Sequence, residues 1–507
     1  MRVQTRLTVA AVLIGAWFGG CMLVRADAAA TAAIDIGSRR ELFVDYFLID
    51  RLQDVQLVLH EPRDEGVVLR FDEPWEGPFC GYSTVIHDGA TYRVYYRGLS
   101  SAGRDGSDAE SCCYAESTDG VHWTKPRLGL FEVAGTRENN VVLSEAAPFT
   151  HNFCPLLDTR PGVPAAERFK ALGGTMESGL RAYVSPDGIH WSPLVDQPVL
   201  TKEGVPFPYM FDSQNLAFWS PAESQYVCFF RVFQDDVRRI CRTSSDDFVT
   251  WSTPVLMEYR HQGGTAPLEH LYTNQTHPYF RAPHLYVAIA ARFMPGRRVL
   301  TDAQAHAIGV NPKYYNDTSD AIFMTSRGGA FYDREFLTGF IRPGIGGSNW
   351  VSRTNYPALN VVQTGPTEMS VYVNQDYAQP TAHLRRYSLR LDGFASARAD
   401  YDGGELVTKP VVFQGDTLSI NFATSAAGGI RVELQQPDGS PIAGFTRDDA
   451  IEQIGNEIDR VVSWKDGSDL SALAGQPVRL CFVMHDADLY ALSFGALSNG
   501  AQSGGNP

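Results

Sequence analysis

The sequence predicts an all-β protein, namely a five-bladed β-propeller followed by a C-terminal β-sandwich. Three observations predict it. A short motif ending in an aromatic residue recurs before residue 400, strand-like runs separated by turn residues precede each copy, and the pattern changes after residue 400. Short strands at even spacing with turns between them are typical of propellers and barrels, and an internal repeat indicates a repeated structural unit.

The repeat is clearest at residues 114–123 (YAESTDGVHW) and 183–191 (YVSPDGIHW). Residues 242–251 (RTSSDDFVTW) are a looser copy, and residues 323–332 (FMTSRGGAFY) are a degenerate one. In each copy we expect a strand to end at Ser, an Asp-Gly pair to make the turn, and the aromatic residue to pack the returning outer strand. Asp caps the backbone of its own turn and Gly tolerates a positive φ, which suits both to that position.

Further strand-like runs complete the units, which gives each blade three or four strands. The five sets are residues 82–86 and 92–97, 151–157 and 168–172, 216–219 and 226–233, 276–280 and 285–293, and finally 357–362, 369–374 and 384–391. Residues 55–60, followed by Glu61 and Pro62, resemble an outer strand without a blade. We expect this segment to pair into the fifth blade and close the ring, because closure removes exposed strand edges.

The pattern after Asp400 predicts a second domain. Alternating runs, which predict half-buried strands of a small β-sandwich, occupy residues 418–422, 430–434, 460–464 and 478–484. The predicted boundaries are a signal peptide over 1–30, the propeller over 34–398, the sandwich over 402–496, and a disordered tail rich in Gly, Ser and Asn over 497–507.

The N-terminus has the three parts of a secretory signal peptide. Arg2 and Arg6 precede an apolar run over residues 7–24, and residues 26–28 (ADA) form a small-x-small cleavage site. We therefore expect a secreted or periplasmic protein. Two weaker alternatives are a retained membrane anchor and a lipoprotein modified at Cys21, although the residues before Cys21 lack the usual leucine.

The net charge limits the kinds of partner, and the cysteine spacing limits the kinds of covalent or metal cross-link. The net charge of −15 at pH 7 argues against nucleic acid and, after signal cleavage, against an anionic membrane, because both reward basic surfaces. Seven cysteines follow the signal segment, in a spacing that fits neither a disulfide framework nor a zinc site. We expect most of them to be buried in strands, with Cys228 and Cys241 as the best candidates for a disulfide.

The S-x-D-G-x-x-W blade ending, the five blades and the trailing sandwich resemble the five-bladed glycosidase superfamily. That group includes invertase-like glycoside hydrolase family 32, arabinanase-like family 43 and the mannoside phosphorylases of family 130. The resemblance covers about residues 40–394 and implies a glycoside hydrolase acting on a poly- or oligosaccharide. The blade motif also resembles the Asp-box of six-bladed sialidases. The invertase motifs are missing and the first blade lacks the arabinanase-type Asp, so sugar, linkage and stereochemistry stay open.

Glycosidic hydrolysis normally uses two carboxyl groups, one neutral and one ionised. The resemblance implies that they project into the central funnel from the starts of the innermost strands, which makes Asp212, Glu269 and Glu76 the catalytic candidates. Asp45 is a fourth, and Glu368 lies near a turn expected on the opposite face. The alternative for each is a solvated loop acid or a turn cap.

Neutral polar and cationic side chains on the funnel side are candidates for sugar binding. Neutral groups suit sugar hydroxyls, and the candidates are His151, Asn152, Asn274, His277 and Asn355. Arg97, Arg231 and Arg292 align at equivalent places in the second strands, and arginine suits a carboxylate or sulfate. An anionic sugar would follow from three funnel arginines. The alternative is that each arginine pairs with a nearby acid, for example in residues 104–108 (RDGSD).

The leading hypothesis is therefore an exported glycoside hydrolase that needs no cofactor and no metal. A second hypothesis is a phosphorylase, in which phosphate replaces water, and a third is a non-catalytic glycan-binding propeller. Trp75 and Trp350 could stack on a sugar face, although an isolated loop Trp more often packs against protein.

Overall fold

The computed structural model describes residues 32–203 and 205–496. The predicted signal peptide and C-terminal tail lie outside the described residues, as does Cys21. Within them the protein is all-β, with one short helix, α1 (Asp302–Ala307), and two 3-10 turns at Ala165–Glu167 and Ser471–Leu473. In this part of the chain no helix has the length and apolarity needed to cross a membrane.

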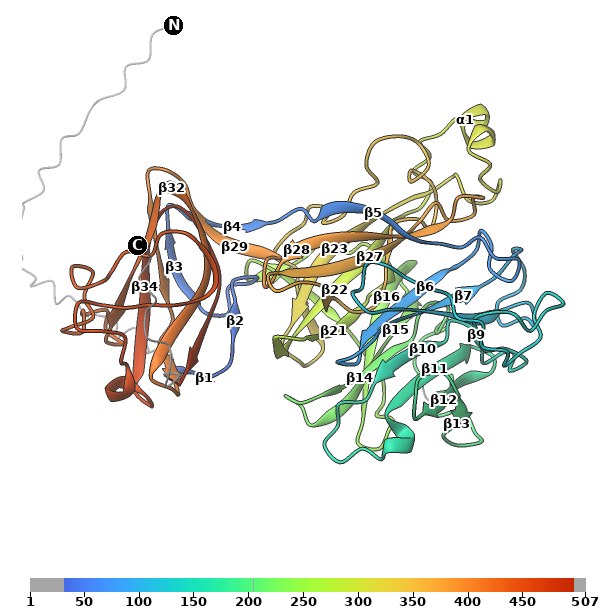
Figure 1. Ribbon diagram of the computed structural model, residues 1–507, viewed down its shortest axis with the longest axis horizontal. Coiled ribbons are helices and arrows are strands. Elements are labelled where there is room, and N and C mark those ends of the chain that lie inside the picture. The colour runs from blue at the N-terminus through green and yellow to red at the C-terminus, as the bar shows by residue number, and fades with distance from the viewer. Residues whose placement is uncertain (1–31, 204, 497–507) are drawn as a thin grey trace, which may run out of the picture.

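The all-β class and the propeller arrangement are confirmed. Five sheets in the described chain contact one another in a cycle, through β6, β10, β14, β21–β22 and β25 and back to β6. Figure 1 shows these sheets beside a second body that carries β32 and β34.

The first three sheets of the cycle each have four antiparallel strands that follow one another in sequence. The first holds β6 (Gly81–His87), β7 (Tyr92–Gly98), β8 (Ser111–Ser117) and β9 (Val141–Leu143). The second holds β10 (Cys154–Leu157), β11 (Phe169–Thr175), β12 (Gly179–Ser185) and β13 (Ser192–Pro193). The third holds β14 (Leu216–Ser220), β15 (Gln225–Gln234), β16 (Val237–Ser245) and β17 (Val255–Leu256).

The last two sheets of the cycle are less regular. The fourth holds β18 (Glu258–His261), β19 (Gly264–Thr265), β20 (His270–Thr273), β21 (Thr276–Tyr279), β22 (Ala282–Met294), β23 (Thr318–Ser326) and β24 (Phe331–Asp333). The fifth holds β25 (Tyr356–Pro357), β26 (Val362–Gln363), β27 (Glu368–Gln375), β28 (His383–Arg390) and, from the N-terminal part of the chain, β5 (Arg63–Arg70).

One residue in or next to an inner strand of each of the five sheets joins a hydrogen-bond network at the centre of the cycle. The side-chain amide of Gln214 donates to Thr84 Oγ1 at 2.7 Å and lies 3.5 Å from Cys154 Sγ. The amide of Gln275 donates to Gln214 Oε1 and to the Pro357 carbonyl, both at 2.7 Å. Because buried polar groups need partners, this network fixes the five sheets around one centre.

The sequence repeat forms the turns at the outer ends of the sheets, as predicted. In the first copy the Ser117 hydroxyl accepts from Gly120 N at 2.9 Å, and Asp119 Oδ1 accepts from the backbone of Val121 and His122, each at 2.8 Å. Residues 185–190 and 245–250 repeat this arrangement. The Asp is needed because its carboxylate satisfies two backbone donors that the turn leaves free.

The predicted closure of the ring by residues 55–60 is wrong by one strand. The segment that pairs into the fifth sheet is β5, which lies antiparallel to β28. The preceding β4 (Val55–Leu59) pairs instead with β29 (Ala395–Ala399), outside the cycle. The physical reason is that β3 and β4 are still bound to C-terminal strands, and the chain reaches the propeller only after Pro62.

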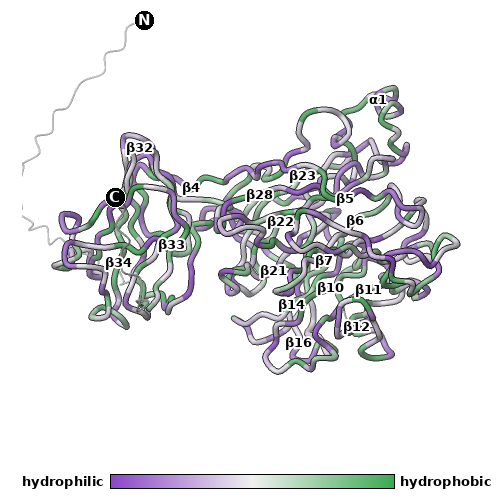
Figure 2. Tube along the Cα trace, in the orientation of Figure 1, coloured by the Kyte–Doolittle hydropathy of each residue, from purple (hydrophilic) through white to green (hydrophobic). Residues whose placement is uncertain are grey.

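The C-terminal strands form a ten-stranded sheet together with the first strands of the chain. Its members are β1 (Ile34–Gly37), β2 (Glu41–Leu42), β3 (Ile49–Gln53), β4, β29, β30 (Gly404–Thr408), β31 (Val411–Phe413), β32 (Thr417–Gln435), β33 (Asn456–Val461) and β34 (Pro477–Gly495). Residues 34–59, which the sequence analysis assigned to the propeller, therefore belong to this sheet. Green segments in Figure 2 follow the strands of both bodies, where the buried apolar residues lie.

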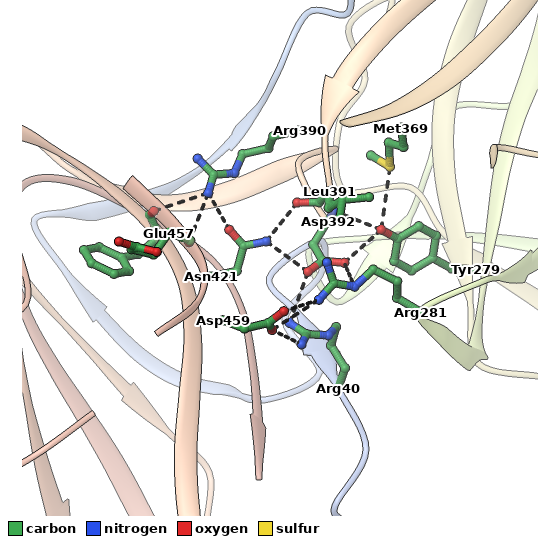
Figure 3. Close-up of polar contacts among 11 residues, drawn as sticks. Arg40, Tyr279, Arg281, Met369, Arg390, Leu391, Asp392, Asn421, Glu457 and Asp459 are labelled. Carbon is green, nitrogen blue, oxygen red and sulfur yellow. Dashed lines mark hydrogen bonds and ion pairs between the residues drawn. The ribbon is translucent and has the colours of Figure 1, made fainter. Parts of the chain in front are cut away.

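A polar cluster joins the two bodies, and Asp392 is its centre (Figure 3). Asp392 is fully buried, and its carboxylate accepts from Arg40, Asn421 and Tyr279 at 3.2, 2.9 and 2.8 Å. Arg281 completes the cluster, 3.5 Å from the same carboxylate and 3.0 Å from Asp459. This buried carboxylate, in the turn after β28 of the fifth sheet, links Tyr279 and Arg281 of the fourth sheet to Arg40 and Asn421 of the C-terminal body.

The seven cysteines of the described chain are buried and free. The expected burial is confirmed, whereas the disulfide between Cys228 and Cys241 is wrong. Although both lie on neighbouring strands, the register pairs Cys228 with Thr243 and Cys241 with Phe230, so the two thiols are not opposite each other.

Candidate active site

One end of the propeller axis is formed by the starts of the innermost strands. Tyr82 and Tyr272 lie on inner strands, Asp212 and Arg353 lie directly before the inner strands of two further sheets, and the four residues line a small cavity of about 30 Å³ there. Tyr82, Arg353 and Phe211, which precedes Asp212, have positive φ angles of 53°, 59° and 65°. Strained backbone of this kind costs about 1–3 kcal/mol per residue and gathers at functional sites. We refer to this end of the axis as the funnel mouth.

The opposite end of the axis holds a larger cavity of about 830 Å³, lined by the ends of the same inner strands. His277 lies there rather than at the funnel mouth. It is buried, its Nδ1 lies 2.8 Å from the Gln275 carbonyl, and its Nε2 accepts from Val361 N at 3.0 Å. Burial lowers the pKa of His277 to about 4, so the ring is neutral near pH 7. Its two nitrogens contact backbone groups.

Asp212 stands at the funnel mouth, as the sequence predicted. Its Oδ2 accepts from the Tyr209 hydroxyl at 2.8 Å and from Nη2 of Arg231 at 2.5 Å. Burial alone would raise the pKa of Asp212, but the Arg231 charge and the Tyr209 hydrogen bond hold it below its ordinary value of 3.8. The carboxylate is therefore ionised near neutral pH.

Asp105 brings a second carboxylate to the funnel mouth from the loop between β7 and β8. One ligand atom from each of Asp105, His151 and Asp212 lies within 4.8 Å of the other two. His151 is buried, with its Nδ1 2.8 Å from Glu110 Oε2 and its Nε2 3.0 Å from the Asn152 amide. The predicted His151 and Asn152 are thus beside the carboxylate pair, and Glu110 orients the imidazole.

The surroundings of the two carboxyl groups shift their pKa values in opposite directions. Although Asp105 is exposed as a residue, partial desolvation of its carboxyl group raises its pKa, His151 opposes the rise, and the negative charge of Asp212 adds to it. Asp105 therefore holds its proton to higher pH than Asp212 does. Two neighbouring carboxyl groups whose pKa values are pushed apart form the usual pattern of an acid and a base or nucleophile.

Of the three predicted arginines, Arg97 lines the funnel mouth and Arg231 contacts Asp212 there without lining the cavity itself. Arg97 is buried, donates to Asn152 Oδ1, the Phe79 carbonyl and the Tyr377 hydroxyl, and lies over the Tyr82 ring at 4.8 Å. Arg231 lies over the Tyr272 ring at 4.2 Å and pairs with Asp212.

Arg292, the third predicted arginine, serves a different set of contacts. Its guanidinium group donates to both oxygens of Asp320, at 2.8 and 2.5 Å, and to Glu269 at 3.3 Å. It is not among the residues that line the funnel mouth. Arg292 therefore pairs with nearby acids, which is the alternative that the sequence analysis gave to binding an anionic sugar.

Glu269 does not line the cavity that contains Asp212. Its two oxygens are engaged by Arg292 and by the buried Arg334. A carboxylate held by two guanidinium groups has little freedom to donate or accept a proton in a reaction. The structure thus groups Glu269 with an ion-pair network at the start of β20.

Glu76 and Asp45 are also held in structural contacts. Glu76 is fully buried, where it accepts from the Tyr96 hydroxyl at 2.5 Å and pairs with Lys125 at 2.7 Å. Asp45 is buried too, lies 3.3 Å from Arg327, and lines a separate cavity next to the fourth sheet. Neither residue lines the funnel mouth.

Asn274 and Asn355, although close to the starts of inner strands, hold the backbone. Asn274 Oδ1 accepts from Thr276 N at 3.1 Å, and the Asn355 amide donates to the Ser319 and Asn349 carbonyls at 2.9 and 3.0 Å. The two tryptophans have similar roles. Trp75 is buried and donates to Asn140 at 2.6 Å, and Trp350 donates to the Gly344 carbonyl at 3.0 Å.

Asp105, His151 and Asp212 are the described residues whose ligand atoms converge closely enough to hold a metal ion. The electrostatics of the funnel mouth oppose this use. Arg231 and Arg353 act on Asp212, and Arg97 acts on Asp105. Three guanidinium groups repel a divalent cation and favour an anion.

Sequence reasoning missed Asp105 and Arg353. Asp105 lies in a loop between two strands of one sheet, whereas the sequence search covered acids directly before inner strands. Arg353 precedes β25 in the same way that Asp212 precedes β14, so a search for cations at strand starts would have found it. No local signal marks Asp105, because only the fold brings its loop over the axis.

No protein-family model and no curated protein sequence matches the chain. Among solved structures the chain is similar to a glycoside hydrolase with a TM-score of 0.43 and 12% identity, over 65% of this chain and 92% of that one. It is similar to an N-acetylgalactosamine deacetylase from F. plautii in complex with blood group B trisaccharide, with a TM-score of 0.42 and 14% identity, over 67% and 97% of the two chains. It is also similar to a β-1,2-mannobiose phosphorylase from Listeria innocua, with a TM-score of 0.41 and 9% identity, over 67% and 98%. The expected resemblance to propeller glycoside hydrolases and phosphorylases is thus found again among solved structures.

Proposed function

We propose that this chain is an exported glycoside hydrolase that cleaves poly- or oligosaccharides at the funnel mouth. The observation that carries the proposal is the pair formed by Asp212 and Asp105. One oxygen of each lies within 4.8 Å of the other. The pKa of Asp212 is lowered and the pKa of Asp105 is raised. A neutral and an ionised carboxyl group side by side are what glycosidic hydrolysis needs.

In the proposed first step Asp212 is the nucleophile and Asp105 is the general acid. A carboxylate oxygen of Asp212 bonds to the anomeric carbon while Asp105 gives its proton to the glycosidic oxygen, and the leaving sugar departs as an alcohol. In the second step Asp105, now ionised, takes a proton from water. The water oxygen bonds to the anomeric carbon and the Asp212 ester breaks, which restores both groups.

The short separation supports this two-step course. Retaining glycosidases place their carboxyl groups about 5–5.5 Å apart, whereas inverting enzymes leave about 6.5–9.5 Å for a water molecule. One oxygen of each group lies within 4.8 Å of the other, which is closer to the retaining range than to the inverting one. We therefore propose retention of anomeric configuration.

We further propose that the five sheets of the cycle are five blades of one propeller, and that the ten-stranded sheet folds as a sandwich. The axis network that takes one residue from each sheet supports the blade count. The apolar cluster shared by β1, β32 and β34 supports a sandwich core. The N-terminal residues 1–30 support export to the periplasm or the medium.

The test is release of reducing sugar from a broad panel of glycans, with and without inorganic phosphate and with and without a chelator. Phosphate-independent and chelator-resistant release supports the proposed hydrolase. Release that requires phosphate would establish a phosphorylase. Loss of activity with the chelator would assign Asp105, His151 and Asp212 to a metal, and binding without turnover would establish a glycan-binding propeller.

A further inference from the structure

Two guanidinium groups at the funnel mouth lack an acidic partner. Neither Arg97 nor Arg353 forms an ion pair with any carboxylate in residues 32–203 and 205–496, and both line the small cavity. The other arginines that the repeat places at equivalent positions are paired, Arg231 with Asp212 and Arg292 with Asp320.

Arg97 is deeply buried, with 7% of its surface exposed. Its terminal nitrogens donate only to neutral acceptors, which are Asn152 Oδ1 at 3.3 Å and the Phe79 carbonyl and Tyr377 hydroxyl at 3.1 Å. Its Nε has no hydrogen-bond partner in the described structure. A buried charge is normally paired, because removing it from water without a counter-charge is costly.

Arg353 faces the same cavity from the segment before β25 of the fifth sheet, which is next in the cycle to the first sheet that carries Arg97. Its backbone has a φ of 59°, and its guanidinium group lies 5.1 Å from the Tyr314 ring centre and 5.5 Å from that of Tyr272. Its hydrogen bond to the Tyr314 hydroxyl is long, at 3.5 Å. The strained backbone thus holds a cation against aromatic rings instead of against an acid.

The cavity suits the charged group of a sugar more than its ring, because its volume is only about 30 Å³. The rings of Tyr82, Tyr272 and Tyr314 lie against guanidinium groups and hold them in place at the cavity. Guanidinium groups bind a carboxylate or a sulfate through charge-assisted hydrogen bonds. The carboxylates of the pair lie at the same mouth, so a ligand held here would be next to them.

We propose that Arg97 and Arg353 form an oxyanion subsite that binds the carboxylate of a uronosyl residue, or the sulfate ester of a sulfated one, in the glycan substrate. The oxyanion supplies the direct ion pair that neither guanidinium group forms within the described residues, where Asp105 and Asp212 act on them only at longer range. The glycan as carrier of the oxyanion rests on the proposed function, whereas the oxyanion itself follows from the unpaired arginines.

The test measures equilibrium binding and does not depend on turnover. Calorimetric titration compares oligosaccharides ending in a uronate or a sulfated sugar with their neutral counterparts and with inorganic phosphate. We expect the charged ligands to bind at least about 10-fold more tightly than the neutral ones, since charge-assisted hydrogen bonds are the strong ones. Rising sodium chloride should weaken only the charged ligands.

Arg353→Met should remove most of this preference, and Arg353→Lys should restore part of it. Arg292→Met is the control, because Arg292 aligns with Arg97 in the blade pattern but is paired with Asp320 and does not line the cavity. It should keep the preference. Thermal melting checks that each variant is folded. The salt dependence of the wild-type protein tests the subsite even if Arg353→Met fails to fold.

Equal affinity for charged and neutral ligands, or equal loss of both in Arg353→Met, would overturn the subsite. Tight binding of inorganic phosphate without any preference for a charged sugar would also overturn it. A preference for charged ligands without turnover would support the subsite and reject the hydrolase. Hydrolysis of neutral glycans alone would support the hydrolase and reject the subsite.

Discussion

Nη2 of Arg231 lies 2.5 Å from Oδ2 of Asp212, across the start of the third sheet of the cycle. The strand β15 carries the arginine, and the loop before β14 carries the acid. The contact fixes one carboxylate oxygen and lowers the pKa of Asp212. An equivalent arginine in the fourth sheet, Arg292, binds Asp320 instead. The same strand position therefore carries an arginine that contacts the candidate active site in the third sheet and an arginine that forms a structural ion pair in the fourth.

Asp212→Asn and Asp105→Asn should each reduce turnover by at least about 100-fold, because removal of a general acid or a nucleophile costs that much or more. The measurement is kcat on the best glycan of the panel, with circular dichroism to confirm the fold. Asp108→Asn is the matched control, since Asp108 is an exposed acid in the same loop as Asp105. An Asp105→Asn enzyme with full activity would reject the assignment of the acid.

The pH dependence of kcat/KM should be bell-shaped. Activity requires ionised Asp212, so it falls when acid protonates a group whose pKa is below 3.8. Activity also requires protonated Asp105, so it falls as pH rises through a pKa above 3.8. Asp105→Asn should abolish the alkaline limb and leave the acid limb in place. A profile that stays flat over both limbs would contradict the pair.

The variant Glu269→Gln tests whether Glu269 is catalytic, as the sequence predicted, or forms structural ion pairs, as the structure shows. If Glu269 is catalytic, this variant loses activity by orders of magnitude. From its contacts with Arg292 and Arg334 we expect less than about 10-fold loss in kcat, and a lower free energy of unfolding because two guanidinium groups lose their acid. Steady-state kinetics and urea denaturation on the same preparation give both quantities. A loss as large as that of Asp212→Asn would return Glu269 to the catalytic machinery.

Asp392→Ala should weaken the junction shown in Figure 3. Asp392 is fully buried between Arg40 and Arg281, and its removal leaves the two cations with only the half-exposed Asp459 as a shared acid. Breaking a buried pair in this way costs about 3–5 kcal/mol. Hydrogen exchange should show lost protection in β32 and in the segment around Tyr279. Asp459→Ala is the milder comparison, because Asp459 is half exposed; equal effects would argue against Asp392 as the centre.

Glu41 should make stability sensitive to acid. Burial alone would raise its pKa, but His284 and Arg327 lower the pKa of Glu41 from 4.5 to about 2. A depressed pKa contributes stability above the unfolded value, and that contribution is lost as pH falls from about 4.5 toward 2. The shift corresponds to about 3 kcal/mol. Thermal melting between pH 2 and 6 should show a smaller pH slope for Glu41→Gln than for the wild type.

The repeat and the strand starts show how far sequence reasoning reached into this fold. Asp119 and its counterparts occur at turns because the Ser and Asp side chains satisfy the turn locally, and such signals are readable in sequence. Asp212 was found because it directly precedes an inner strand. Residues 55–60 were misplaced, since a strand pattern shows that a segment is extended but not which partner it pairs with.

The sequence by itself determined the all-β class, the repeated turns and the position of Asp212 at a strand start, because those depend on local backbone chemistry and on periodicity. Only the tertiary structure decided that Asp105 faces Asp212, that Arg353 and not Arg292 reaches the funnel mouth, and that Glu269 and Glu76 are held in ion pairs. These depend on how sheets far apart in sequence meet around one axis, and on which charges burial leaves unpaired.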